Sequence, residues 1–200
     1  SMENLEFVNQ NLNRRGFKSC IVPGAHEALT TALGIIGSCS VGIGGSLSVE
    51  QIKLYDELKQ RGNAVFWHWR DGAAAKIQAA RADFYVCSAN AVTADGIIFL
   101  TDGSGNRISA LSFGPKNAIL IIGKNKVVGD GREAVMRIRS AECAGANAKR
   151  LGLHTPCADL GECDDCASPE RICRVTAFFE RPSSGLENTY VILADCNLGL

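Results

Sequence analysis

Short apolar runs alternate along this chain with stretches in which apolar residues recur at helical spacing. Leu29, Leu33 and Ile36 follow the helical spacing, and the run Cys39–Ile43 after them predicts a short buried strand. A chain that repeats this order builds a mostly parallel sheet covered on both faces. We therefore predict an α/β protein with three layers, α/β/α. The predicted strands are 39–43, 63–67, 84–87, 96–100, 118–122, 175–179 and 190–194, and the predicted helices are 29–36, 48–62, 73–82 and 134–150.

The composition is that of an ordinary globular chain whose charges balance. Of the 200 residues, 46% are hydrophobic and 21% are charged, so the chain can bury one sizeable core, and we expect a single domain over residues 1–200. Lys plus Arg and Asp plus Glu number 21 each. Nucleic acids and anionic membranes usually require a basic surface, so we expect neither as a partner.

The first residues bear on where the protein is expected to work. Ser1 is expected to remain from expression, which makes Met2 the natural start. The polar stretch 3–17 has no apolar signal-peptide core, and no run approaches the roughly eighteen apolar residues that span a bilayer. We expect a cytoplasmic protein. Thiols stay reduced in that compartment, so the nine cysteines are not expected to form a disulfide framework.

Four of these cysteines lie within seventeen residues, in the pattern C-x5-C-x2-C-x6-C. Pro156 and Pro169 prevent a continuous helix through this segment, about residues 154–175. Clustered thiolates repel one another unless a cation is bound, so the pattern predicts a metal centre. Structural zinc favours two C-x2-C pairs and only one is present, whereas Pro beside a ligand is common in iron–sulfur proteins. We favour a [4Fe–4S] cluster, with zinc as the alternative. The predicted ligands are Cys157, Cys163, Cys166 and Cys173.

A glycine-rich loop joins a predicted strand to a predicted helix and is a candidate anion site. Ser48 and Gln51 form the S-x-x-Q pattern of a helix start, which places the loop at a helix N-terminus, where backbone N–H groups attract anions. The spacing is neither G-x-G-x-x-G nor a P-loop, and a tight strand–helix turn would need the same glycines. The candidate residues are Gly42, Gly44, Gly45 and Ser46.

Two further polar segments follow predicted strands and extend this candidate site. Open α/β sheets bind ligands at the carboxyl ends of their strands. Segment 102–107 combines flexible glycines with an Arg suited to carboxylate or phosphate, and a basic triplet follows strand 118–122. We predict that an anionic small molecule also contacts Ser88, Asn90, Thr93, Asp95, Asp102, Gly103, Gly105, Asn106, Arg107 and Lys124. The three histidines and Cys87 are interpreted as surface or packing residues, so no catalytic residue is assigned.

Six sequence blocks in their order resemble the LUD family, named for lactate utilisation, and specifically its smaller branch with a C-terminal cysteine motif. The blocks are VGIGGSLSVEQIKLYDELKQRG, ADFYVCSANAVTADG, DGSGNR, FGPKNAILIIGKNKVV, NAKRLGLHTPC and CDDCASPERIC. The resemblance implies a fold similar to that of ribose-5-phosphate isomerase, glucosamine-6-phosphate deaminase and the CoA-transferases, which bind phosphorylated sugars or CoA thioesters at strand ends. The isomerases' paired acids are replaced here by Ser88, Asn90 and Thr93, with only Asp95 acidic, so their chemistry does not carry over residue by residue.

The resemblance also implies a place in metabolism. LUD proteins are similar to components of an iron–sulfur, multi-subunit system that oxidises L-lactate to pyruvate. Iron–sulfur protein partners are therefore expected, and the sequence is compatible with an oligomer. Two alternatives stay open. One is a non-catalytic redox or sensor module, and the other is the same fold with structural zinc and an unrelated substrate. The sequence does not decide whether the protein is an enzyme.

Overall fold

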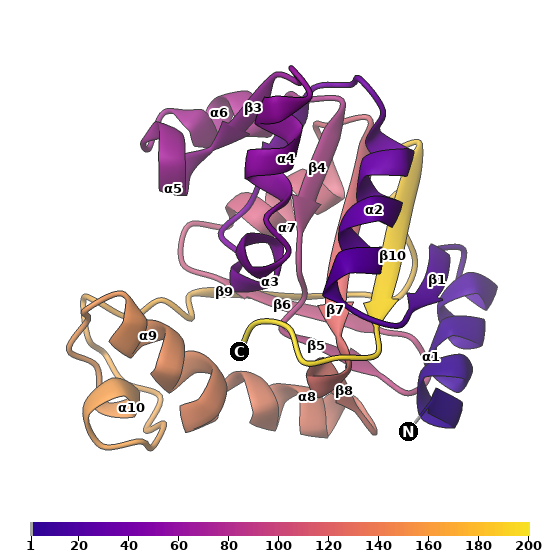
Figure 1. Cartoon of the computed structure of the whole chain (residues 1–200). Helices are drawn as coiled ribbons and strands as arrows, with labels where there is room; N and C mark the ends of the chain where they lie inside the picture. Colours follow the sequence, from indigo (N-terminus) through magenta and orange to yellow (C-terminus); the bar gives the residue numbers. More distant parts are fainter. Residues whose placement is uncertain (1) are drawn as a thin grey trace.

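The computed structural model describes residues 2–200, and Ser1 lies outside them. At its centre is sheet A, in which all neighbouring strands run parallel (Figure 1). In spatial order its strands are β1 (Lys18–Val22), β10 (Asn188–Ala194), β7 (Asn117–Gly123), β4 (Phe84–Cys87), β2 (Val41–Ile43) and β3 (Val65–Trp67). The predictions of a mostly parallel sheet and a three-layer α/β fold are confirmed.

A second, smaller sheet, sheet B, lies against one face of sheet A. Within it β5 pairs parallel with β8, and β6 pairs antiparallel with both β5 and β9. In spatial order its strands are β8 (Val127–Val128), β5 (Ala91–Thr93), β6 (Ile98–Asp102) and β9 (Val175–Phe179). The remaining regular elements are helices, most of which connect the strands of the two sheets. They are α1 (Met2–Arg14), α2 (Ala25–Ile36), α3 (Leu47–Gln51), α4 (Leu54–Gln60), α5 (His68–Asp71), α6 (Ala75–Ala79), α7 (Asn106–Ser112), the 3₁₀-helix η1 (Lys124–Lys126), α8 (Gly131–Ile138), the π-helix η2 (Ala141–Gly145), α9 (Ala146–Arg150) and α10 (Pro156–Asp159).

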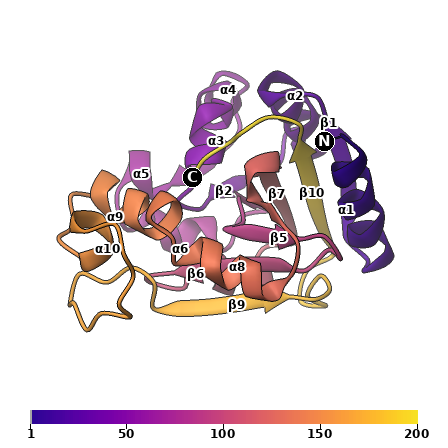
Figure 2. The ribbon, with the colours of Figure 1, turned by 90° about the horizontal axis from the view of Figure 1, so that it is seen from below.

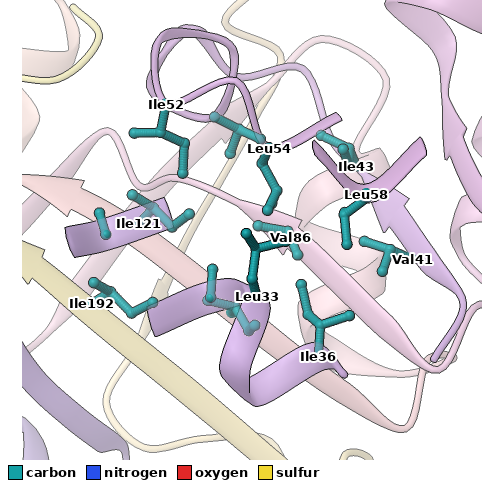
Figure 3. Packing of buried hydrophobic residues seen from close by; sticks show 14 of the residues in the cluster. Leu33, Ile36, Val41, Ile43, Ile52, Leu54, Leu58, Val86, Ile121 and Ile192 are labelled. Atoms are coloured by element: carbon teal, nitrogen blue, oxygen red, sulfur yellow. The ribbon is translucent and has the colours of Figure 1, made fainter. Parts of the chain in front are cut away.

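One face of sheet A is covered by helices alone. Leu33 of α2 and Leu58 of α4 are at most 3% exposed and pack onto strand residues such as Val86 and Ile121 (Figure 3). Successive side chains of a strand point to opposite faces of the sheet, so every second side chain enters this layer and the others enter the layer on the opposite face. Truncating one such leucine to Ala typically costs about 2–5 kcal/mol, which makes this layer the rigid base for the loops at the strand ends.

The opposite face of sheet A packs against sheet B together with α1 and α7. Leu120 of β7 and Leu193 of β10 meet Leu12 of α1, Leu111 of α7 and Leu100 of β6 in a second buried cluster. This layer therefore contains both helices and a sheet, whereas the sequence predicted helices alone on this face. Beyond it, α8 covers the outer face of sheet B, as seen from below in Figure 2. No helix among residues 2–200 is long and apolar enough to cross a membrane.

The helix predicted from Ser48 begins elsewhere and is broken. Its N-cap is Ser46, whose Oγ accepts from the Val49 backbone N–H at 3.2 Å. Lys53 then adopts a positive φ of 60°, which ends α3 and starts α4. The capping-box prediction was wrong because Ser48 is turned into the protein and Gln51 accepts from the backbone N–H of Gly199.

The helix predicted over 134–150 is also interrupted. It consists of α8, the π-helix η2 and α9, and η2 begins after Ser140, whose Oγ accepts from the Cys143 backbone N–H at 3.2 Å. A serine that bonds the backbone competes with a continuing helix, and the apolar spacing gives no sign of that competition. The two last predicted strands exist as β9 and β10, but they belong to different sheets.

Candidate functional site

A cavity of about 570 Å³ lies at the carboxyl ends of β2, β4 and β7. Parallel strands end at the same edge of their sheet, so the loops after β2 and β4 and the helix η1 after β7 meet there. The opposite walls come from α7, from η2 and α9, and from Ile172 and Cys173. Both α5 and α9, of which α5 lies above α9 in Figure 1, contribute side chains to the lining.

Arg107 of α7 is held in the wall of the cavity by four hydrogen bonds. Its Nε donates to Asp102 Oδ1 at 2.7 Å, and Nη2 donates to Asn90 Oδ1 at 3.0 Å and to the Thr101 carbonyl at 2.7 Å. Nη1 donates to the Ser88 carbonyl at 3.3 Å. A guanidinium has five N–H donors, so one N–H on Nη1 is left for a ligand.

The partner carboxylate, Asp102, is buried and fully engaged. Its second oxygen, Oδ2, accepts from the Ile108 backbone N–H at 2.8 Å, so the same side chain fixes the start of α7 and the Arg107 guanidinium. The two side chains are only 2% and 13% exposed. Burial opposes the charged form of Arg107, but Asp102 outweighs it and raises the arginine's pKa. Gly44 is required for packing, because a Cβ there would lie 2.8 Å from both Arg107 Cγ and Tyr85 Oη.

Lys126 lies beside this pair and is 5% exposed. Its Nζ is 2.9 Å from Ser88 Oγ and 3.0 Å from Ser48 Oγ. Burial, and then the positive charge of Arg107, lower its pKa from 10.5 to about 7. Lys126 and its neighbours form a hydrogen-bonded polar network at the base of the cavity, which we call the cavity floor; all of its residues except Ser48 line the cavity. The floor consists of Ser48, Ser88, Asn90, Asp102, Arg107 and Lys126.

The rim of the cavity is aromatic and basic. Trp69 of α5 stacks on Trp67, and the guanidinium carbon of Arg150 lies 4.7 Å from the Trp69 ring centroid. His68, whose pKa is lowered by burial and by Lys76, adds a ring with a buried Nδ1 that has no hydrogen-bond partner among the described residues. The charged side chains that line the cavity are four basic ones and one acidic one. They are Lys76, Arg107, Lys126, Arg150 and Asp102.

Comparisons with known proteins identify the family. The family model described as LUD domain matches residues 5–194. The chain belongs to the LUD domain family. Among solved structures it is similar to a DUF162 family protein from Deinococcus radiodurans, with a TM-score of 0.58 and 17% identity over 96% of this chain and 97% of that one. At that identity the likeness shows the fold alone. No curated protein sequence matches the chain.

The structure of this LUD protein brings together residues from all three polar segments predicted from the sequence. The sequence-predicted residues that line the cavity are Gly45, Ser46, Ser88, Asn90, Asp102, Gly103, Asn106 and Arg107. Those that do not line it are Gly42, Gly44, Thr93, Asp95, Gly105 and Lys124. Gly42 packs against the Ala79 backbone, and Gly105 has a positive φ of 75° where α7 begins. Ligand contact by the first group stays a prediction.

Two charged side chains predicted at the site lie elsewhere in the LUD fold. Asp95 accepts from Thr93 Oγ1 at 2.6 Å and forms an ion pair at 2.8 Å with Arg15, the residue that follows α1. Lys124 forms a 3.0 Å ion pair with Asp195. Both residues follow strands as predicted, but β5 lies in sheet B and ends at α1, away from the cavity. The basic triplet forms a 3₁₀-helix with about three residues per turn, which turns its first and last lysines to different sides.

The sequence did not predict that Lys126, or Trp69 and Arg150 of the rim, would lie at the candidate site. Lys126 belongs to the basic triplet that the sequence analysis noticed, and its position after the most apolar strand, β7, was the available signal. Trp69 and Arg150 are far apart in the sequence, and nothing in their local pattern predicts that they stack. Cys87, interpreted as a packing residue, is fully buried, and burial raises the pKa of its thiol to about 12.

The predicted metal segment, residues 154–175, which we call the cysteine segment, is held by a guanidinium. Arg171 donates to the carbonyls of Cys166 at 2.9 Å and Cys173 at 3.0 Å, and it pairs with Asp165 at 2.8 Å. Among the described residues, no three His, Cys, Asp or Glu side chains are arranged to hold a metal ion. The four cysteines in this arrangement therefore do not fit a four-thiolate centre, and the predicted metal-binding segment is not confirmed.

Proposed function

We propose that this LUD protein acts in the metabolism of small organic acids and binds an anionic molecule in the cavity. The observation that carries the proposal is the charge of the lining, in which Lys76 and Arg150 add positive charge and the single acidic side chain, Asp102, already has a basic partner. That carboxylate, Asp102, is neutralised by its own 2.7 Å ion pair with Arg107. A concave site with an uncompensated positive charge attracts anions and holds them more strongly than an exposed surface would.

The size of the cavity bears on the kind of acid. About 570 Å³ lies within the range of sites that hold drug-sized ligands. A three-carbon acid such as lactate would leave most of this space to water. The Trp69 ring and the apolar side chains of Leu47, Ile138 and Leu151 also line the cavity. We therefore propose an organic acid with an apolar or planar portion, or an acid that carries a phosphate or thioester group.

Ligand-induced thermal stabilisation tests this proposal, with phenylpyruvate, phosphoenolpyruvate and 2-oxoglutarate as probes, pyruvate and L-lactate as the smaller acids for comparison, and sodium chloride as the reference anion. Arg150 is the best residue to change, because it lies at the rim and its side-chain partners are Asn147 and the Trp69 ring. We expect Arg150→Ala to weaken binding of the stabilising acid by about three- to tenfold, as for a partly solvated charge.

The matched control is Arg132→Ala, which removes an exposed arginine from α8 that does not line the cavity. It should leave the stabilisation unchanged. Equal losses in the two variants, or no acid that stabilises the protein more than chloride does, would contradict the proposal. Arg107→Ala is a poorer test, because it leaves Asp102 buried without its partner and destabilises the fold whether or not a ligand binds.

We also propose that Cys157, Cys163, Cys166 and Cys173 bind a metal centre, a [4Fe–4S] cluster or, as the alternative, zinc. The support is the density of thiols in the sequence, and the cysteine segment would have to rearrange for them to converge. No chemical step is assigned to this centre. Metal analysis and the absorption spectrum of anaerobically purified protein separate the two metals, since thiolate-bound iron clusters absorb broadly near about 400 nm and zinc does not.

A further inference from the structure

Lys126 occupies an unusual position for a lysine. It stands at the end of η1, directly after the central strand β7, and its side chain reaches into the cavity floor. Its polar contacts are the hydroxyls of Ser48 and Ser88, and it has no ion pair with a carboxylate of residues 4–200. Lysines that are this deeply buried normally have a charged partner, because an isolated ammonium is costly to desolvate.

The groups that face the Lys126 amine make its charged form less stable still. Arg107 of α7 and Arg137 of α8 are both positive. Cys143 of η2 and Cys87 of β4 act in the opposite direction, but the Cys87 thiol has a pKa raised to about 12 and carries no charge near neutral pH. The resulting pKa of Lys126, about 7, leaves a large fraction of the amine neutral at physiological pH.

The hydrogen bonds also orient the amine. A neutral amine has two N–H bonds and one lone pair. Ser48 Oγ and Ser88 Oγ accept the two N–H bonds at 3.0 and 2.9 Å. The lone pair is then the position left for an approaching electrophile, and both Lys126 and Ser88 line the cavity. A desolvated lysine beside a second cation is the arrangement that activates amines for attack on carbonyl carbon.

We propose that Lys126 is a nucleophile that forms an imine with the carbonyl group of an oxo acid bound in the cavity. The proposal rests on the proposed function, because the basic lining is what would hold the acid's carboxylate. It narrows the substrate class from anionic acids in general to acids that carry a ketone or an aldehyde.

The step balances without an oxidant or a cofactor. The Nζ lone pair attacks the carbonyl carbon, and the C=O π pair moves to oxygen, which takes up a proton. The Nζ atom releases a proton, and the resulting carbinolamine loses its hydroxyl group as water while the C=N bond forms. Ser88 Oγ, 2.9 Å from Nζ, is placed to accept the proton from nitrogen and to pass one to the departing oxygen.

Reductive trapping tests the proposal. The full-length protein is incubated with glyoxylate, pyruvate or 2-oxoglutarate in the presence of cyanoborohydride, and its intact mass is measured. Reduction of a pyruvate imine adds the mass of pyruvic acid less one oxygen atom. We expect a single adduct with at least one of the three acids, located by fragmentation at Lys126. The trapping rate should rise about tenfold per pH unit up to about pH 7 and then level off.

Two variants make the result specific. Lys126→Met removes the amine and should abolish the adduct. Lys116→Met removes a surface lysine, 67% exposed and paired with Asp83 at 3.6 Å, and should leave the adduct intact. Circular dichroism and thermal unfolding establish that both variants are folded. If Lys126→Met does not fold, fragmentation of the wild-type adduct alone decides the site.

The outcomes separate this inference from the proposed function. Thermal stabilisation by an oxo acid without any adduct would overturn the nucleophile and leave the anion site intact. Adducts spread over many surface lysines, or retained in Lys126→Met, would also overturn it. If no acid stabilises the protein and no adduct forms, both the proposed function and the imine are wrong.

Discussion

The cavity floor and the cysteine segment face the same cavity but are built in opposite ways. Floor side chains are buried or half-buried and bond one another, so that Asp102, Arg107 and Asn90 hold one another in place. In the cysteine segment Cys163 is exposed, and Arg171 binds backbone carbonyls while the thiols remain apart. The floor is thus preorganised by its own side chains, whereas hydrogen bonds to the backbone hold the cysteine segment and leave its thiols apart.

The largest expected effect comes from breaking the ion pair in the floor. Asp102→Asn leaves the Arg107 guanidinium buried without its carboxylate, and we expect a loss of about 3–5 kcal/mol in the free energy of unfolding. Urea unfolding followed by circular dichroism measures it. The matched change in the cysteine segment, Asp165→Asn, breaks a pair whose Asp is 65% exposed and should cost about 0–1 kcal/mol. Similar losses of unfolding free energy in the two variants would show that the ion pair in the floor stabilises the protein no more than the pair in the cysteine segment does.

The pH dependence of stability gives a smaller and more specific effect. The pKa of Lys126 is about 7 in the folded protein and near 10.5 when unfolded, so its charge destabilises the fold most below pH 7. Between these values the unfolded chain binds more protons, and the Lys126 contribution to stability therefore rises with pH. From pH 7 to 9 we expect wild-type stability to gain roughly 2–3 kcal/mol relative to Lys126→Met. If the free energy of unfolding changes with pH in the same way in both proteins, burial does not destabilise the charged form of Lys126.

The smallest effect on stability is expected in the cysteine segment. Cys166 is half-buried, and its structural contact is its carbonyl, which Cys166→Ser preserves. In metal-free protein we expect this substitution to change the free energy of unfolding by no more than about 0.5 kcal/mol. In protein loaded with iron and sulfide, or with zinc, the same variant should lose bound metal, measured by elemental analysis. A large loss of metal-free stability would mean that the thiol itself packs the segment, and unchanged metal content would remove Cys166 from the ligands.

Much of the fold follows from local patterns. The apolar runs identified the strands β2 to β4, β6 and β7, and the order of strands and helices predicted the parallel sheet, because these signals depend only on which side chains must be buried. The N-terminal pair α1 and β1 and the whole of sheet B as a separate layer were not predicted. Sheet B depends on the pairing of β6 with β9, which are far apart in the sequence, and no local pattern specifies such a partner.

The candidate site was predicted in outline for the same reason. Polar loops after parallel strands meet at one edge, and Ser88 and Asn90, which follow β4, line the cavity, as does Arg107 from α7. The choice of Lys124 over Lys126 failed, because a shift of two residues in a 3₁₀-helix changes which lysine faces inward. The sequence did not predict that Arg107 also has a structural role, in which its bond to Asp102 fixes it in the wall of the cavity.

The place of β10 in sheet A has a consequence for the order in which the protein is assembled. This strand lies between β1 and β7, and β1 pairs with it from Lys18↔Tyr190 to Val22↔Ala194. The first strand of sheet A along the chain is therefore joined to the sheet by the last one. Until residues 188–194 are synthesised, β1 has no neighbour in sheet A, and the apolar edge of β7 is open to pairing with other chains. Closing so long a loop is a slow step in folding, so the edge of β7 stays open until the last strand of sheet A has paired with it.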